Sequence, residues 1–189
     1  MRVLLTDGNE RATLAVTRAL GIKGVEVIVG AETARSLAGA SRYCTERFVY
    51  ASPYHAPDQY LTCLLSSVKT YAVDALFPIS DLAMALISPA KARFEEYTRM
   101  PIPAADGFQL VSDKYRLMQL AVTQGVPIPE TVFVPDGKVE SVLDKIRTFP
   151  VVVKPGCSLV HRDGRWTKTS VCYADSREEL LRLYSERSY

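Results

Sequence analysis

The chain lacks the two glycine-rich sequences that mark most nucleotide-binding proteins. The turn within LLTDGNERATLA holds only Gly8 where a dinucleotide-binding fold carries G-x-G-x-x-G. The P-loop pattern G-x-x-x-x-G-K-[ST] is absent from all 189 residues. These absences argue against a nicotinamide dehydrogenase and against a P-loop nucleoside triphosphatase.

Signatures of metal or disulfide chemistry are also missing. None of the four cysteines has C-x-x-C spacing, and only two histidines are present. A zinc site and a disulfide scaffold are therefore disfavoured, and free thiols in a reducing, cytoplasmic compartment are expected. Cys157 lies near Lys154, but no other neighbour in the sequence would lower its pKa, so an ordinary thiol is the favoured interpretation.

Long apolar runs and strong net charge are absent as well. No run approaches the roughly 20 residues of a membrane helix, and MRVLLTDGNE turns polar too early for a signal peptide. The net charge is +2, without a basic run, so neither nucleic acid nor a membrane is an expected partner. With 48% apolar residues, the composition is that of an ordinary globular protein.

The first part of the chain alternates strand and helix patterns. This alternation predicts an α/β fold with a parallel sheet and helices on both faces. The apolar stripes of 57–71 and 82–97 fit the covering of that sheet or contact with a second subunit of a homo-oligomer. The strands are expected at 2–6, 25–30, 46–52 and 74–80, and the helices at 10–20, 57–71 and 81–97.

The segment MPIPAADG (100–107) predicts a boundary between one domain at 1–107 and another at 108–189. In the second domain, Asp163-Gly164 predicts a hairpin turn. The other expected elements are a helix after Ser112-Asp113, a strand after the prolines of 126–135, a helix at 140–148, strands at 151–154 and 171–174, and a helix at 176–188.

Lys114 lies in the first turn of the helix that Ser112 or Asp113 would cap. A cation at this end opposes the helix dipole, at a cost of about 0.3–1 kcal/mol. Lysine together with the free N–H groups of a helix start would form a phosphate site. The alternative is a lysine that extends to solvent along the helix edge.

Lys154 follows the valines of FPVVVKPG, which indicate a strand covered on both faces. Open α/β sheets bind ligands at the carboxyl ends of their strands. Pro155 ends regular pairing there, and Gly156 permits a tight departure. Lys154 could bind a phosphate from this position, or simply point into solvent.

The two lysines together resemble the ATP-grasp superfamily, in particular carbamoyl-phosphate-synthase-like enzymes and carboxylate–amine ligases. The residues that carry the resemblance are Asp113-Lys114, Ala121, Gly125 to Pro129 and Phe149 to Pro155, together with FPISDLAMALIS earlier in the chain. The resemblance covers essentially the whole chain. It implies a Rossmann-like domain that precedes the ATP-grasp fold, followed by a partial α+β ATP-grasp subdomain.

The resemblance implies an ATP- and Mg²⁺-dependent ligase, which activates a carboxylate or bicarbonate as an acyl phosphate for attack by an amine. Lys114 and Lys154 would bind the ATP phosphates, with the flap residue Ser158 near them. No catalytic residue is assigned. The candidate lining for the carboxylate substrate lies at the ends of the first and third strands and comprises Asp7, Gly8, Asn9, Arg11, Ser80 and Asp81. For the first of these turns, the alternative is a tight turn in which Asp7 or Asn9 caps the following helix.

Two departures from the family pattern matter. The flap after Lys154-Pro155 has no run of glycines, and the adenine hinge and acidic metal ligands would lie beyond Tyr189. The expectation is therefore an N-terminal portion of a longer ligase, inactive by itself. The alternative is a non-catalytic module that binds a nucleotide or small ligand.

Overall fold

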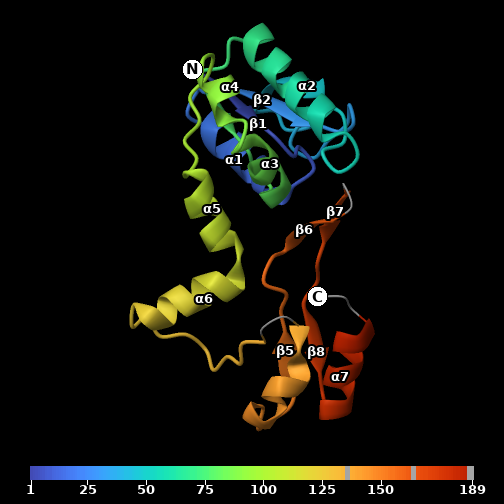
Figure 1. Ribbon diagram of the computed structural model, residues 1–189. Coiled ribbons are helices and arrows are strands. Elements are labelled where there is room, and N and C mark those ends of the chain that lie inside the picture. The colour runs from blue at the N-terminus through green and yellow to red at the C-terminus, as the bar shows by residue number, and fades with distance from the viewer. Residues whose placement is uncertain (135–136, 163–164, 187–189) are drawn as a thin grey trace. The chain divides into compact units, whose positions relative to one another are not determined.

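A computed structural model describes residues 1–134, 137–162 and 165–186 (Figure 1). The chain divides into two compact units, Met1–Ala105 with Arg162–Trp166, and Asp106–His161 with Thr167–Tyr189. The domain boundary expected at 107/108 stays a prediction, because compactness does not test whether either part folds alone.

The first unit is built on a parallel sheet of four strands in the order β3-β2-β1-β4. The strands are β1 (Arg2–Leu5), β2 (Glu26–Ala31), β3 (Cys44–Val49) and β4 (Ala75–Phe77). Val3 of β1 lies opposite Val27 on one side and Ala75 on the other. The predicted parallel α/β sheet is confirmed, and its strand order reverses between β1 and β4, where such sheets bind ligands.

Helices cover both faces of this sheet (Figure 1). They are α1 (Arg11–Gly21), α2 (Pro57–Thr70), α3 (Asp81–Ile87) and α4 (Lys91–Glu95). Alternate residues of β1 point to opposite faces. Val3 packs in a cluster with Leu14 of α1, and Leu4 packs in another cluster with Leu64 of α2.

The helix expected over 81–97 is divided into α3 and α4. Pro89 lies between them and has no N–H to donate to a helical hydrogen bond. Phe94 of α4 is nevertheless fully buried in the same cluster as Leu4, so the break redirects the chain without loss of the apolar face.

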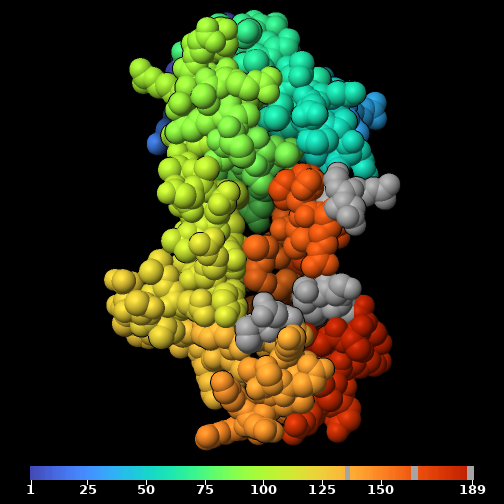
Figure 2. Space-filling model, viewed as in Figure 1, coloured from blue at the N-terminus to red at the C-terminus, as the bar shows by residue number. Residues whose placement is uncertain are grey.

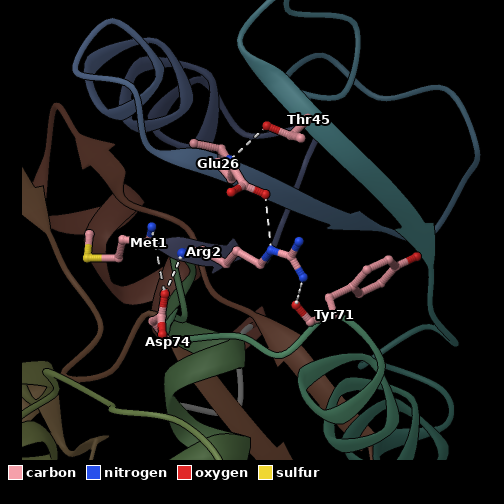
Figure 3. Close-up of polar contacts among 7 residues, drawn as sticks. Met1, Arg2, Glu26, Thr45, Tyr71 and Asp74 are labelled. Atoms are coloured by element: carbon pink, nitrogen blue, oxygen red, sulfur yellow. Dashed lines mark hydrogen bonds and ion pairs between the residues drawn. The ribbon is translucent and has the colours of Figure 1, made fainter.

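Arg2 forms several hydrogen bonds at the amino end of the sheet (Figure 3). Its Nε atom lies 3.0 Å from Glu26, and its Nη1 donates to the carbonyl of Tyr71 at 3.0 Å. Its backbone N–H donates to Asp74 at 2.7 Å. Arg2 thus joins the starts of β1 and β2 to the turn after α2, at the end of the sheet opposite Asp7.

From Ala105 onward the chain forms short elements. They are α5 (Ala105–Ser112), α6 (Lys114–Thr123), a 3-10 helix η2 (Val139–Lys145), β5 (Val151–Val153), β6 (Leu159–Arg162), β7 (Arg165–Lys168), β8 (Cys172–Ala174) and α7 (Arg177–Glu186). β5 pairs with β8 antiparallel, and β6 pairs with β7. Val142, Val153, Ala174 and Leu180 form the core of the second unit.

Several expectations for the second unit were wrong. α5 was not expected, and the strand expected after the prolines of 126–135 is not formed within residues 126–134. The expected helix at 140–148 is a shorter 3-10 helix. The expected turn at Asp163-Gly164 and the last residues of the 176–188 helix lie outside the described residues.

The helix α6 has no fully buried side chain, and it lies at the surface in Figure 2. Val122, for example, is 56% exposed. None of the described helices combines the length and the apolar character needed to cross a membrane.

Candidate functional site

Lys114 and Ser158 meet in the second unit. The Nζ atom of Lys114 donates a hydrogen bond of 2.8 Å to the hydroxyl oxygen of Ser158, 44 residues further along the chain. Lys114 is the first residue of α6, and Ser158 directly precedes β6. Two of the three predicted phosphate-binding residues therefore lie in direct contact.

The start of α6 is closed by its own neighbours. The Asp113 carboxylate accepts hydrogen bonds from the backbone N–H groups of Tyr115 (2.9 Å) and Arg116 (3.2 Å). The backbone N–H of Lys114 donates to the Gly156 carbonyl at 2.7 Å. The expected free N–H groups are thus already engaged, and that part of the interpretation was wrong. Attraction of an anion at this point depends on the Lys114 side chain.

Gly156 allows the chain after β5 to approach α6 closely. A Cβ atom at this position would lie 3.2 Å from the Asp113 carboxylate and 3.7 Å from the Cβ of Tyr115. The next residue, Cys157, forms an antiparallel bridge with Asp113. A side chain at position 156 would therefore crowd the start of α6.

The thiol of Cys157 lies beside these charged groups. Burial, followed by the negative charge of Asp113, raises its pKa, and Lys114 opposes that shift. The direction agrees with the expected ordinary thiol, since a reactive cysteine needs a lowered pKa.

Lys154 is exposed and directly follows β5. Among residues 1–134, 137–162 and 165–186, no hydrogen bond or ion pair of its ammonium group is found. Val153 is 6% exposed but Val152 is 49% exposed, so the expectation of a strand covered on both faces was wrong. Lys154 lies two residues before Gly156, and its role in binding phosphate stays a prediction.

Asp7 and Ser80 meet at the carboxyl edge of the parallel sheet in the first unit. The Asp7 carboxylate accepts a 3.0 Å hydrogen bond from the backbone N–H of Ser80 and another from the Thr6 hydroxyl. The alternative for this turn, capping of α1 by Asp7 or Asn9, does not occur. Asn9 instead accepts a hydrogen bond from the backbone N–H of Leu37 at 3.2 Å.

The other predicted lining residues differ in what they can offer a ligand. Gly8 is buried, and a Cβ there would lie 2.7 Å from the Ser36 hydroxyl. Arg11 is exposed at the start of α1, and Asp81 is exposed at the start of α3. Among the predicted lining residues Arg11 is the only cation, so it is the natural partner for a carboxylate.

Tyr50 and Thr169 support these sites and were not identified from the sequence. The Tyr50 hydroxyl accepts a hydrogen bond from the Asp7 backbone N–H at 2.9 Å. Burial, and then the charge of Asp7, raises the pKa of Tyr50. Thr169 donates from its hydroxyl to the carbonyl of Cys157 at 2.7 Å. Neither residue stands in a recognisable motif, so the sequence carried no signal for them.

No protein-family model matches the chain, and neither does any curated protein sequence. Solved protein structures, in contrast, match the chain. The chain is similar to L-amino acid ligase from Bacillus licheniformis (TM-score 0.66, 12% identity, 98% of this chain and 41% of that one). It is also similar to N5-carboxyaminoimidazole ribonucleotide synthetase from Thermotoga maritima (TM-score 0.60, 20% identity, 96% and 42%).

A third similar structure is the biotin carboxylase domain dimer of 2-oxoglutarate carboxylase from Hydrogenobacter thermophilus, with MgADP, ADP and bicarbonate (TM-score 0.60, 18% identity, 98% and 40%). The chain has the fold of the N-terminal part of ATP-grasp ligases. The ATP-grasp resemblance is therefore confirmed at the level of fold. The chain spans 40–42% of the length of these three structures.

The described part of the chain holds no group of three or more His, Cys, Asp or Glu side chains that could bind a metal ion. The cations Lys114 and Lys154 fit phosphate oxygens.

Proposed function

We propose that residues 1–189 form the N-terminal part of an ATP-dependent ligase. The enzyme would activate a carboxylate or bicarbonate: its oxygen attacks the γ-phosphorus of ATP, ADP leaves, and an acyl phosphate forms. An amine then attacks the acyl carbon and phosphate leaves. The observation that carries the proposal is the contact of Lys114 with Ser158, in a fold shared with such ligases.

Lys114 and Lys154 would bind the nucleotide phosphates in this scheme. Phosphoryl transfer needs the triphosphate to be neutralised and held in line with the attacking oxygen. An ammonium group serves as a point charge for this purpose. The Ser158 hydroxyl, which now holds the Lys114 ammonium, would bind a phosphate oxygen together with it.

The carboxylate substrate would lie at the carboxyl edge of β1 and β4. Arg11 would supply the positive charge, because Asp7 and Asp81 would repel an anion. Gly8, Asn9 and Ser80 complete the proposed lining. Mg²⁺, which the reaction would require, would be bound by residues outside this chain. A homo-oligomer acting on small molecules in the cytoplasm is the proposed setting.

A second candidate is a module that binds a nucleotide or small ligand without catalysis. The segment after Lys154-Pro155, which has no run of glycines to form a flap over the phosphates, favours it. By itself, the 189-residue chain is expected to bind nucleotide weakly and without turnover under either proposal. Only the activity of the whole protein therefore distinguishes the binding module from the ligase.

A titration of the ¹⁵N-labelled chain with MgATP, followed by NMR, tests the proposed binding site. We expect the largest backbone shifts at residues 113–116 and 154–158. AMP, which lacks the β- and γ-phosphates, serves as the control ligand and should shift these residues less. Shifts confined to other segments, or none at millimolar MgATP, would contradict the proposal.

A further inference from the structure

Thr169 binds two consecutive backbone carbonyls of the segment that carries Ser158. Its hydroxyl donates to the Cys157 carbonyl at 2.7 Å, and its backbone N–H donates to the Ser158 carbonyl at 2.9 Å. Thr169 directly follows β7, and Ser158 directly precedes β6. Thr169 therefore joins the end of β7 to the residue before β6.

The other side of the same segment is held by α6. The Gly156 carbonyl accepts a hydrogen bond from the backbone N–H of Lys114, and Cys157 forms an antiparallel β-bridge with Asp113. The Cys157-Ser158 peptide is thus fixed between α6 and Thr169. With its backbone fixed, the Ser158 hydroxyl lies 2.8 Å from the Lys114 ammonium.

We propose that Thr169 is a positioning residue: by binding the Cys157 and Ser158 carbonyls, it holds the Ser158 hydroxyl where it fixes the Lys114 ammonium for phosphate binding. The inference rests on the proposed nucleotide role of Lys114. Any residue except proline supplies a backbone N–H at position 169, so the hydroxyl is the contribution that threonine itself makes.

Amine labelling of the ligand-free chain tests the positioning directly. The chain is treated with a limiting amount of acetic anhydride, and acetylation is measured at each lysine by mass spectrometry, with Lys69 as the internal reference. Thr169→Val should raise the rate at Lys114 about two- to tenfold, the effect of one lost hydrogen bond. Thr169→Ser, which keeps the hydroxyl, should restore the original rate.

Thr123→Val is the matched control. The Thr123 hydroxyl also donates to a backbone carbonyl, that of Gln119 at 2.9 Å, but at the far end of α6. This variant should leave the Lys114 rate unchanged. Equal rates at Lys114 in Thr169→Val and the original chain, or an equal rise in Thr169→Ser, would overturn the inference.

A double-mutant cycle tests the same link if Thr169→Val destabilises the fold. Ser158→Ala breaks the same link without a change at Thr169, and it should raise the Lys114 rate to a similar extent. Thr169→Val combined with Ser158→Ala should then add nothing further, because the two act through one contact. Additive effects would show that Thr169 does not act through Ser158, and would overturn the inference.

MgATP affinity separates this inference from the proposed function. Both hold if Lys114→Ala and Thr169→Val each weaken MgATP binding while Thr169→Ser does not. If Thr169→Val raises the Lys114 labelling rate but Lys114→Ala leaves MgATP binding unchanged, the proposed function fails and the positioning role stands. If Lys114→Ala weakens binding but Thr169→Val changes neither quantity, the positioning role fails alone.

Discussion

The carboxylate of Asp7 accepts a 3.0 Å hydrogen bond from the backbone N–H of Ser80. Asp7 lies just after the end of β1, and Ser80 lies just after the end of β4. The two residues lie 73 positions apart in the sequence. They meet because β1 and β4 are neighbouring parallel strands whose carboxyl ends share one edge. This bond joins the two sides of the point where the strand order reverses.

Asp7→Ala should lower the free energy of unfolding by about 1–3 kcal/mol, because the partly buried Ser80 N–H and Thr6 hydroxyl lose their acceptor. Asp7 also has a φ angle of 58°, a conformation that alanine adopts less readily than aspartate or asparagine. Asp7→Asn, which keeps an acceptor and tolerates this φ, should cost less. Urea denaturation measures both, and equal losses would contradict the role given to the side-chain oxygen.

Gly8→Ala should destabilise the first unit by about 1–3 kcal/mol through overpacking. The added methyl group would lie 2.7 Å from the Ser36 hydroxyl and 2.9 Å from a Val29 methyl group. Thermal denaturation checks the expectation, with Gly107→Ala as the control, because nothing lies within 4 Å of a Cβ there. A Gly8→Ala variant as stable as the original chain would show that this packing is looser than described.

Tyr50 makes stability depend on pH in the alkaline range. Burial and the Asp7 charge raise its pKa in the folded state, so the unfolded chain releases the phenolic proton at lower pH than the folded chain. Its contribution is therefore complete below the ordinary tyrosine pKa of about 10 and declines as the pH rises above it.

Tyr50→Phe should reduce this alkaline loss of stability, while it lowers stability at neutral pH by about 1 kcal/mol through the lost bond to the Asp7 N–H. Urea denaturation between neutral pH and pH values above the ordinary tyrosine pKa measures both effects. Tyr43→Phe is the control, since its ring is less buried. Equal alkaline slopes in the Tyr50→Phe and original chains would contradict the assignment.

The fold of the first unit could be largely predicted from the sequence. The buried runs around Val3, Val27 and Leu76 mark strands, and the stripe that contains Leu64 marks a helix, because hydrophobic periodicity is a local property. The single helix expected over 81–97 was wrong although its break has a local cause, because Pro89 cannot donate a helical hydrogen bond.

The candidate site was only partly accessible from the sequence. Lys114, Lys154 and Ser158 were identified by spacing and resemblance, but the state of the α6 N–H groups depends on Asp113 and Gly156, which meet only in the folded chain. The exposure of Val152 likewise depends on what packs against the β5-β8 pair. Contacts between distant segments follow from tertiary structure and leave no local pattern.

The central claim is that Lys114 binds the phosphates of ATP. The most direct measurement is the dissociation constant for MgATP of the original chain, Lys114→Ala and Lys23→Ala, an exposed lysine that controls for the change in net charge. We predict that Lys114→Ala weakens binding about tenfold or more, the effect of losing one charge-assisted hydrogen bond, and that Lys23→Ala leaves it unchanged. Equal affinities in the original and Lys114→Ala chains would contradict the claim.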